Sequence, residues 1–354
     1  MPSAAWPGPP QVGALREDGT VDPARAEGIP DELAVALYEQ MVLSRETDAH
    51  LVALQRQGRI THHASAAGEE AAIVGAAAGV RDEDWMFLAS REFAAALWRG
   101  MPLGALVHHA LGTARGPGRG RDTYAPPFWK PARVVSASPL SATQIPHAAG
   151  VAWSARARRE DVAALVFFGE GATSSADFHA GLNFAGVTRA PLIAVCRNNG
   201  WATSLPSDRQ TASDGFAVKA VAYGVRAVRV DGGDVIAVLA VVREARARAA
   251  AGEGCTLIEA VVPPRPDSGD VSSSPADPIA RMRRHLEGRG LWSDDRDARL
   301  RDEVHADVRR AIAEADAEPS SPTPDFTDDV YASLPWHLRE QRQAMAPRDP
   351  AAGG

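Results

Sequence analysis

The second half of the chain alternates apolar and amphipathic segments, with the apolar ones recurring about every 30 residues. The apolar segments predict strands at 162–169, 191–199, 225–232 and 255–262, and the amphipathic ones predict helices at 142–158, 174–186, 214–224 and 234–250. Because these strands are apolar at consecutive positions, both faces of their sheet must be covered. The pattern therefore predicts an α/β fold, with a mainly parallel sheet and helices on both faces.

The rest of the chain supplies further expected helices and loops. Helices are expected from Asp31 to Gly58, over 68–80 and 277–292, and roughly over 294–316, and long loops over 114–135 and 263–276. We expect three parts: a Pro-rich, extended N-terminal arm over 1–28, one α/β domain over 29–320 and a C-terminal tail over 321–354.

Composition excludes some functions. The net charge of −7 gives no reason to expect a nucleic-acid or membrane surface. No apolar segment approaches the ~20 residues of a membrane span, and the N-terminus lacks the features of a signal peptide. Cys196 and Cys255, the only cysteines, fall in strand-like segments and are expected to be buried thiols. A cytoplasmic location is expected.

Polar residues stand at the ends of two of these strands. Glu170 lies between Gly169 and Gly171, and Asn198 and Asn199 end the next strand. Read singly, these residues could simply cap turns. Together, at neighbouring carboxyl ends of a parallel sheet, they predict an oxygen-ligand site for Mg²⁺ that shares phosphate oxygens with a bound cofactor. The following helix start also favours phosphate.

The Gly-Glu-Gly segment, followed after 26 residues by Asn-Asn, resembles the thiamine-diphosphate motif. The surrounding sequence resembles the α subunit of the decarboxylating component of 2-oxo acid dehydrogenase complexes, most closely the branched-chain type. The resemblance covers about residues 15–342 and is carried by GEGATSSADFHAGLNFA, RNNGWATSLP, SPLSATQIPHAAG, YGVRAVRVDGGDVIAV, LIEA and DVYASLPWHLREQ.

The resemblance implies a thiamine-diphosphate-binding fold and an assembly of two α and two β chains, with thiamine diphosphate and Mg²⁺ held between α and β. It implies that a 2-oxo acid is decarboxylated and that the acyl group passes to a lipoyl-bearing transacylase. By this resemblance Glu170, Asn199 and Trp201 hold the metal, Trp201 through its backbone carbonyl. The expected cofactor-binding residues are Arg91, Ser138, Leu140, Gly169, Gly171, Ala172 and Arg197.

The chain also departs from the family pattern. The loop after LIEA usually carries a histidine that reaches the active site, but here residues 263–276 contain none. Ser90 replaces a tyrosine next to Arg91. His62 and His63 are candidates to replace the missing catalytic histidine, because they follow a helix end on the expected substrate side.

These departures leave three functions open. The chain is a working α subunit, a divergent paralogue that binds the same cofactor but uses another acyl donor or acceptor, or a non-catalytic partner that stabilises a β-type chain.

Overall fold

A seven-stranded sheet forms the centre of the computed structural model, which describes residues 7–121, 126–135, 140–263, 276–318, 327 and 331–345. The strand order is β1-β8-β9-β5-β4-β2-β3, and every neighbouring pair is parallel. The strands are β1 (Gln11–Val12), β2 (Trp85–Phe87), β3 (Val134–Val135), β4 (Ala164–Gly169), β5 (Leu192–Asn198), β8 (Arg226–Asp231) and β9 (Thr256–Val261). A separate antiparallel hairpin joins β6 (Trp201–Ala202) to β7 (Leu205–Pro206).

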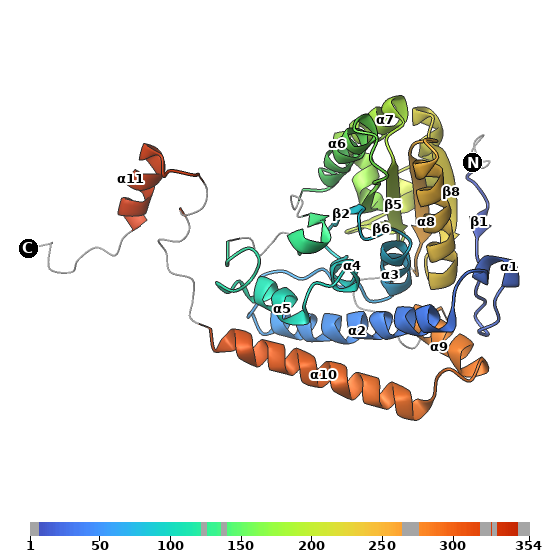
Figure 1. Ribbon diagram of the computed structural model, residues 1–354, viewed down its shortest axis with the longest axis horizontal. Coiled ribbons are helices and arrows are strands. Elements are labelled where there is room, and N and C mark those ends of the chain that lie inside the picture. The colour runs from blue at the N-terminus through green and yellow to red at the C-terminus, as the bar shows by residue number, and fades with distance from the viewer. Residues whose placement is uncertain are drawn as a thin grey trace, which may run out of the picture.

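Helices surround this sheet (Figure 1). The α-helices are α1 (Pro23–Ala26), α2 (Asp31–Arg56), α3 (Glu70–Ala78), α4 (Phe93–Trp98), α5 (Leu103–Leu111), α6 (Gln144–Ala157), α7 (Ala176–Thr188), α8 (Val235–Ala250), α9 (Pro278–Gly288), α10 (Asp294–Asp316) and α11 (Trp336–Met345). The 3-10 helices are η1 (Lys130–Ala132), η2 (Glu170–Ser174), η3 (Ser207–Arg209) and η4 (Ala217–Tyr223).

The sheet is buried on both faces, as predicted. Leu165 and Phe167 of β4 pack into a core with α2, α3 and α8, whereas Val166 and Phe168 pack into a second core with α6 and α7. Since successive side chains of a strand point to opposite faces, each of the central strands β4, β5, β8 and β9 contributes to both cores. This two-sided burial explains why the central strands are apolar at consecutive positions.

The sequence predicted the four central strands and most of the helices, but two expectations need correction. The segment 214–224 is not an α-helix: its Ala217–Tyr223 part is the 3-10 helix η4. Its start is set by the buried carboxylate of Glu259, which accepts the backbone N–H of Phe216 and of Ala217. The expected loop 114–135 ends in β3, which pairs with β2 and is too short to show a strand period.

The expected N-terminal arm lies against its own chain over much of its length. Gln11 and Val12 pair with β8, which makes β1 an edge of the sheet. Asp234, the N-cap of α8, accepts the N–H of Ala14 and of Leu15, both at 2.6 Å. This buried carboxylate therefore anchors the arm and caps a helix. Residues 1–6 of the arm lie outside the described residues.

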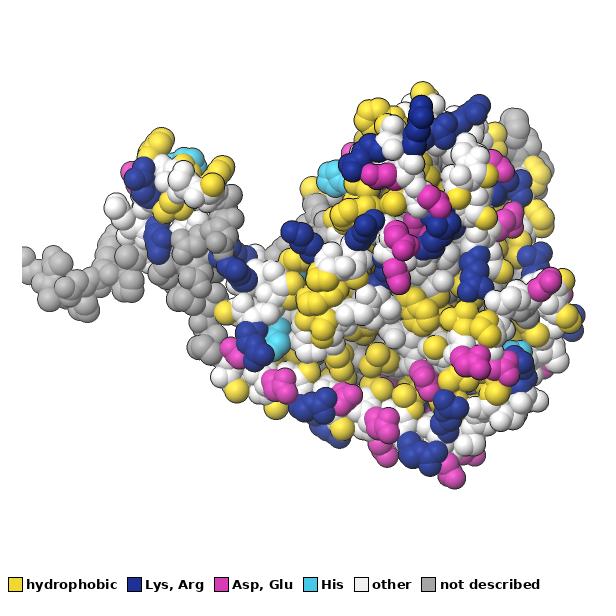
Figure 2. Space-filling view, in the orientation of Figure 1, with side chains coloured by type: hydrophobic (Ala, Val, Ile, Leu, Met, Phe, Trp, Pro, Cys, Tyr) yellow, Lys and Arg dark blue, Asp and Glu magenta, His cyan; other side chains and the backbone are white. Residues whose placement is uncertain are grey.

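The surface shown in Figure 2 mixes charges of both signs, with acidic and basic side chains alternating along the lower edge formed by α10. In the part of the chain that the structure describes, no helix is long and apolar enough to cross a membrane. The helix α11, in the expected C-terminal tail, contributes no buried residue.

Candidate cofactor and metal site

The ends of β4 and β5 bring the two predicted polar motifs together. Gly169 is the register partner of Arg197, so Glu170 and the Asn198-Asn199 pair follow at the same edge of the sheet. After them Gly200 adopts a φ of +84°, a left-handed conformation that favours glycine. The chain then turns back through the β6–β7 hairpin, which places Trp201 beside Glu170.

A cavity of about 540 Å³ lies over these strand ends. Its lining includes ten of the predicted site residues: His62, Arg91, Leu140, Gly169, Glu170, Gly171, Ala172, Arg197, Asn199 and Trp201. Ser138 and residues 264–275 lie outside the described residues, so the structure says nothing of the expected pyrimidine contact of Ser138 or of most of the divergent loop.

Glu170 is the most unusual group in this cavity. Its side chain belongs to a residue only 2% exposed, and its Oε1 has no hydrogen-bond partner among the described residues. Burial, with the nearby charge of Glu69, raises the pKa of Glu170 to about 7 although Arg197 and backbone N–H groups oppose the shift. A buried oxygen without a partner is costly, and a divalent cation would satisfy it.

The other predicted metal ligands also fit a hard cation. The side-chain oxygen of Asn199 accepts the N–H of Trp201 at 3.0 Å, which leaves one of its two lone pairs. Within the described ranges, no cluster of three or more His, Cys, Asp or Glu side chains could hold a metal alone. One carboxylate, one amide oxygen and one backbone carbonyl therefore suit a Mg²⁺ ion that takes further oxygens from a diphosphate.

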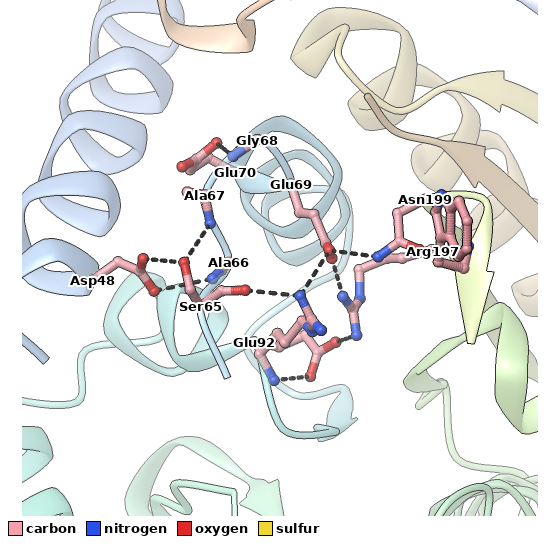
Figure 3. Close-up of polar contacts among 12 residues, drawn as sticks. Asp48, Ser65, Ala66, Ala67, Gly68, Glu69, Glu70, Glu92, Arg197 and Asn199 are labelled. Carbon is pink, nitrogen blue, oxygen red and sulfur yellow. Dashed lines mark hydrogen bonds and ion pairs between the residues drawn. The ribbon is translucent and has the colours of Figure 1, made fainter. Parts of the chain in front are cut away.

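Two arginines reach the same cavity and are tied together by Glu69. The buried guanidinium of Arg197 pairs with Glu69 and, on its other amino group, with Glu92. Arg91 lies 3.4 Å from Glu69 through Nη1 and also donates to the carbonyl of Ser65 at 2.9 Å. Figure 3 shows the carboxylate of Glu69 in contact with both Arg197 and Asn199, and the amide nitrogen of Asn199 lies 3.4 Å from that carboxylate. Glu69 thus joins both arginines to a predicted metal ligand.

Comparison with known proteins agrees with this geometry. The dehydrogenase E1 component family model matches residues 38–262. The chain belongs to the dehydrogenase E1 component family. Membership implies the use of thiamine diphosphate.

Three named relatives of this E1 chain are α subunits. The 3-methyl-2-oxobutanoate dehydrogenase subunit alpha of Mycobacterium tuberculosis is 39% identical, over 94% of this chain and 93% of its own length. The 2-oxoisovalerate dehydrogenase subunit alpha 1 of Arabidopsis thaliana is 36% identical, over 95% of this chain and 74% of its own length. The human 2-oxoisovalerate dehydrogenase subunit alpha is 34% identical, over 94% of this chain and 78% of its own length.

Sequence reasoning missed Glu69 and Glu92 of this E1 chain. Both carboxylates are buried, and burial raises the pKa of Glu92 even though Arg197 lowers it. A signal was present: Glu69 and Glu70 open a helix made otherwise of small and apolar residues. An acidic pair in such a helix needs cationic partners, and the structure supplies Arg197 to Glu69 and Arg45 to Glu70.

Glu259 is a second missed residue, and it shapes the turn that carries Asn199. Its Oε1 accepts the side-chain N–H of Asn198 at 2.7 Å, and Asn198 in turn accepts the N–H of Gly200 at 3.0 Å. The other oxygen of Glu259 caps η4. The buried glutamate of the LIEA segment therefore fixes the Asn-Asn-Gly turn through its hydrogen bond to Asn198.

The two candidate histidines lie differently. His62 lines the main cavity, whereas His63 lines an adjoining cavity of about 380 Å³. The two cavities share Arg91, Asn199 and Trp201 in their linings, together with His62 and Thr203. The structure thus brings both histidines to cavities that share predicted site residues, His62 to both cavities and His63 to the second.

Proposed function

We propose that this chain is the α subunit of a branched-chain 2-oxo acid dehydrogenase that binds Mg²⁺–thiamine diphosphate in the 540 Å³ cavity. The names of the relatives support the substrate class, since they act on 2-oxoisovalerate or 3-methyl-2-oxobutanoate. The observation that carries the cofactor part is the unpartnered, buried oxygen of Glu170, in one cavity with Asn199 and two arginines.

Each residue has a defined task in this proposal. Glu170, Asn199 and the carbonyl of Trp201 hold the metal, and Arg91 and Arg197 face the diphosphate, for which guanidinium groups suit bidentate binding. Gly171 and Ala172 allow the backbone to approach it closely, with Gly169 at the preceding turn, and Leu140 supports the rest of the cofactor. When bound, thiamine diphosphate supplies the electron sink for loss of CO₂.

A β subunit completes the site in this proposal. Leu140 is 68% exposed although it lines the cavity, and a second chain over the cavity mouth would bury it. Trp201, which lines the same cavity, is also 40% exposed, and exposed apolar side chains that gather in one place mark an interaction surface. We propose an assembly of two α and two β chains that transfers the acyl group to a lipoyl-bearing transacylase.

Co-expression with a β-type chain tests this function. The purified complex, supplied with Mg²⁺ and thiamine diphosphate, should release CO₂ and reduce an electron-accepting dye with 3-methyl-2-oxobutanoate, and do so faster than with pyruvate. A complex that binds the cofactor but turns over no 2-oxo acid would contradict the proposal and indicate a non-catalytic partner. Faster turnover of another donor would indicate a divergent paralogue.

A further inference from the structure

His63, which lines the 380 Å³ cavity, forms a buried pair with Asp48. The Nε2 of His63 lies 2.8 Å from Oδ1 of Asp48, and the two side chains are only 9% and 4% exposed. Asp48 also accepts the hydroxyl of Ser65 and, at 3.0 Å, the N–H of Ala66 (Figure 3). Burial alone would raise the pKa of Asp48, but His63 and these hydrogen bonds outweigh it and hold the pKa below its usual range.

This arrangement leaves the other nitrogen of the imidazole available. Nε2 of His63 is hydrogen-bonded to Asp48, while its Nδ1 has no hydrogen bond to the described residues. The ring lines the cavity and packs against Phe93, whose ring centre lies 5.9 Å away. A carboxylate bound to one imidazole nitrogen fixes the orientation of the ring and stabilises the positive charge that it gains on protonation.

The cavity itself suits an anionic ligand. Its lining contains two arginines, Arg56 and Arg91, and no carboxylate side chain. It opens beside Asn199 and Trp201, the residues proposed to hold the metal. A 2-oxo acid is an anion, so this cavity would attract it next to the proposed cofactor site.

We propose that His63, held by Asp48, is an acid–base residue that contacts the 2-oxo acid in the 380 Å³ cavity. The inference rests on the proposed function. The electron pair for a new bond to the carbonyl carbon of the 2-oxo acid would come from the cofactor, and the π electron pair of the C=O bond would then pass to its oxygen. The Nδ1–H bond of the imidazolium breaks and an O–H bond forms, while the neutral imidazole keeps its hydrogen bond to Asp48.

The first test compares wild type with His63→Gln in the complex with the β chain. Glutamine can still donate to Asp48, so the loop should fold. We expect kcat to fall about 10²–10⁴-fold, the usual contribution of acid–base catalysis, and KM to rise by at most about tenfold. His50→Gln is the matched control, because His50 lies on α2, the helix that carries Asp48, but contacts His305 outside both cavities.

A second test separates chemistry from structure. In His63→Ala, added imidazole should restore at least about a tenth of the lost kcat, because it can enter the vacated space and carry the proton. Asp48→Asn should lower kcat without preventing decarboxylation. A role limited to pinning the loop predicts instead a lowered melting temperature and no response to imidazole, and that outcome would overturn the proposal.

A third measurement does not require turnover. The acylphosphonate analogue of 3-methyl-2-oxobutanoate, which cannot lose CO₂, is titrated into the cofactor-loaded complex by calorimetry. We expect His63→Gln to weaken its binding about tenfold. Equal affinities for wild type and variant would overturn the role of His63. Normal binding of the analogue with no turnover of any 2-oxo acid would count only against the proposed function.

Discussion

The carboxylate of Glu69 forms a buried ion pair with the guanidinium of Arg197, 128 positions further along the chain. This pair links the start of α3 to the end of β5. Because Glu69 also lies against Arg91 and Asn199, it connects the groups proposed for the diphosphate with one proposed for the metal. The shape of the site thus depends on Glu69, a buried residue that contacts several of the proposed ligands.

Replacing Glu69 should therefore affect both stability and cofactor binding. Without Glu69, Arg197 keeps Glu92 as a partner but one of its buried donors loses its acceptor, so Glu69→Ala should lower the free energy of unfolding by about 1–3 kcal/mol. Urea denaturation measures this loss. Glu160→Ala, which breaks an exposed pair with Arg158, should cost at most about 1 kcal/mol. Equal losses in the two variants would contradict the importance of the buried pair.

Glu259→Gln tests whether the hydrogen bond from Asn198 to Glu259 fixes the Asn-Asn-Gly turn. The amide keeps only one acceptor oxygen, so it cannot serve both Asn198 and the backbone of η4. We expect metal-dependent thiamine diphosphate binding to weaken about tenfold, within the range known for groups that orient metal ligands. Calorimetric titration gives this affinity. Glu253→Gln, at an exposed pair with Arg248, serves as the control and should bind normally.

Metal binding should depend on pH near neutrality. The pKa of Glu170 is raised to about 7, so in the metal-free site its carboxyl becomes protonated as the pH falls through 7. A proton and a cation compete for the same oxygen, and the apparent Mg²⁺ affinity should be about tenfold weaker at pH 6 than at pH 8. Titrations at several pH values, corrected for Mg²⁺ binding to free thiamine diphosphate, measure this slope. A flat profile would contradict Glu170 as a ligand.

Gly171→Ala should displace the hairpin that carries Trp201. A Cβ at position 171 would lie 2.8 Å from the Cβ of Ala202, closer than such atoms approach. Overpacking of this kind typically costs about 1–3 kcal/mol, which thermal unfolding can detect. Gly104→Ala is the matched control: it lies in α5 with no heavy atom within 4 Å of an added Cβ, and should stabilise the chain slightly.

The sequence predicted the sheet and the edge at which the site lies because both depend on local patterns. The apolar strands, their spacing and the glycines around Glu170 are visible in short windows. Short elements escaped prediction: β2 and β3 have three and two residues, and their pairing depends on distant strands.

The buried carboxylates that position the site residues could not be predicted in the same way. Glu69, Glu92 and Glu259 act through partners that are far away along the chain, and no spacing reveals such contacts. His63 was a candidate from its position alone, but its pairing with Asp48 required the fold. The roles of the cavity residues as ligands, and the cytoplasmic location, stay predictions.

Binding of thiamine diphosphate to the complex with the β chain, measured with and without Mg²⁺ for wild type and Glu170→Ala, tests whether Glu170 holds the metal. We expect wild type to bind the cofactor only with the metal and Glu170→Ala to lose about 100-fold in affinity. Unchanged, metal-dependent affinity in Glu170→Ala would contradict the assignment of the site.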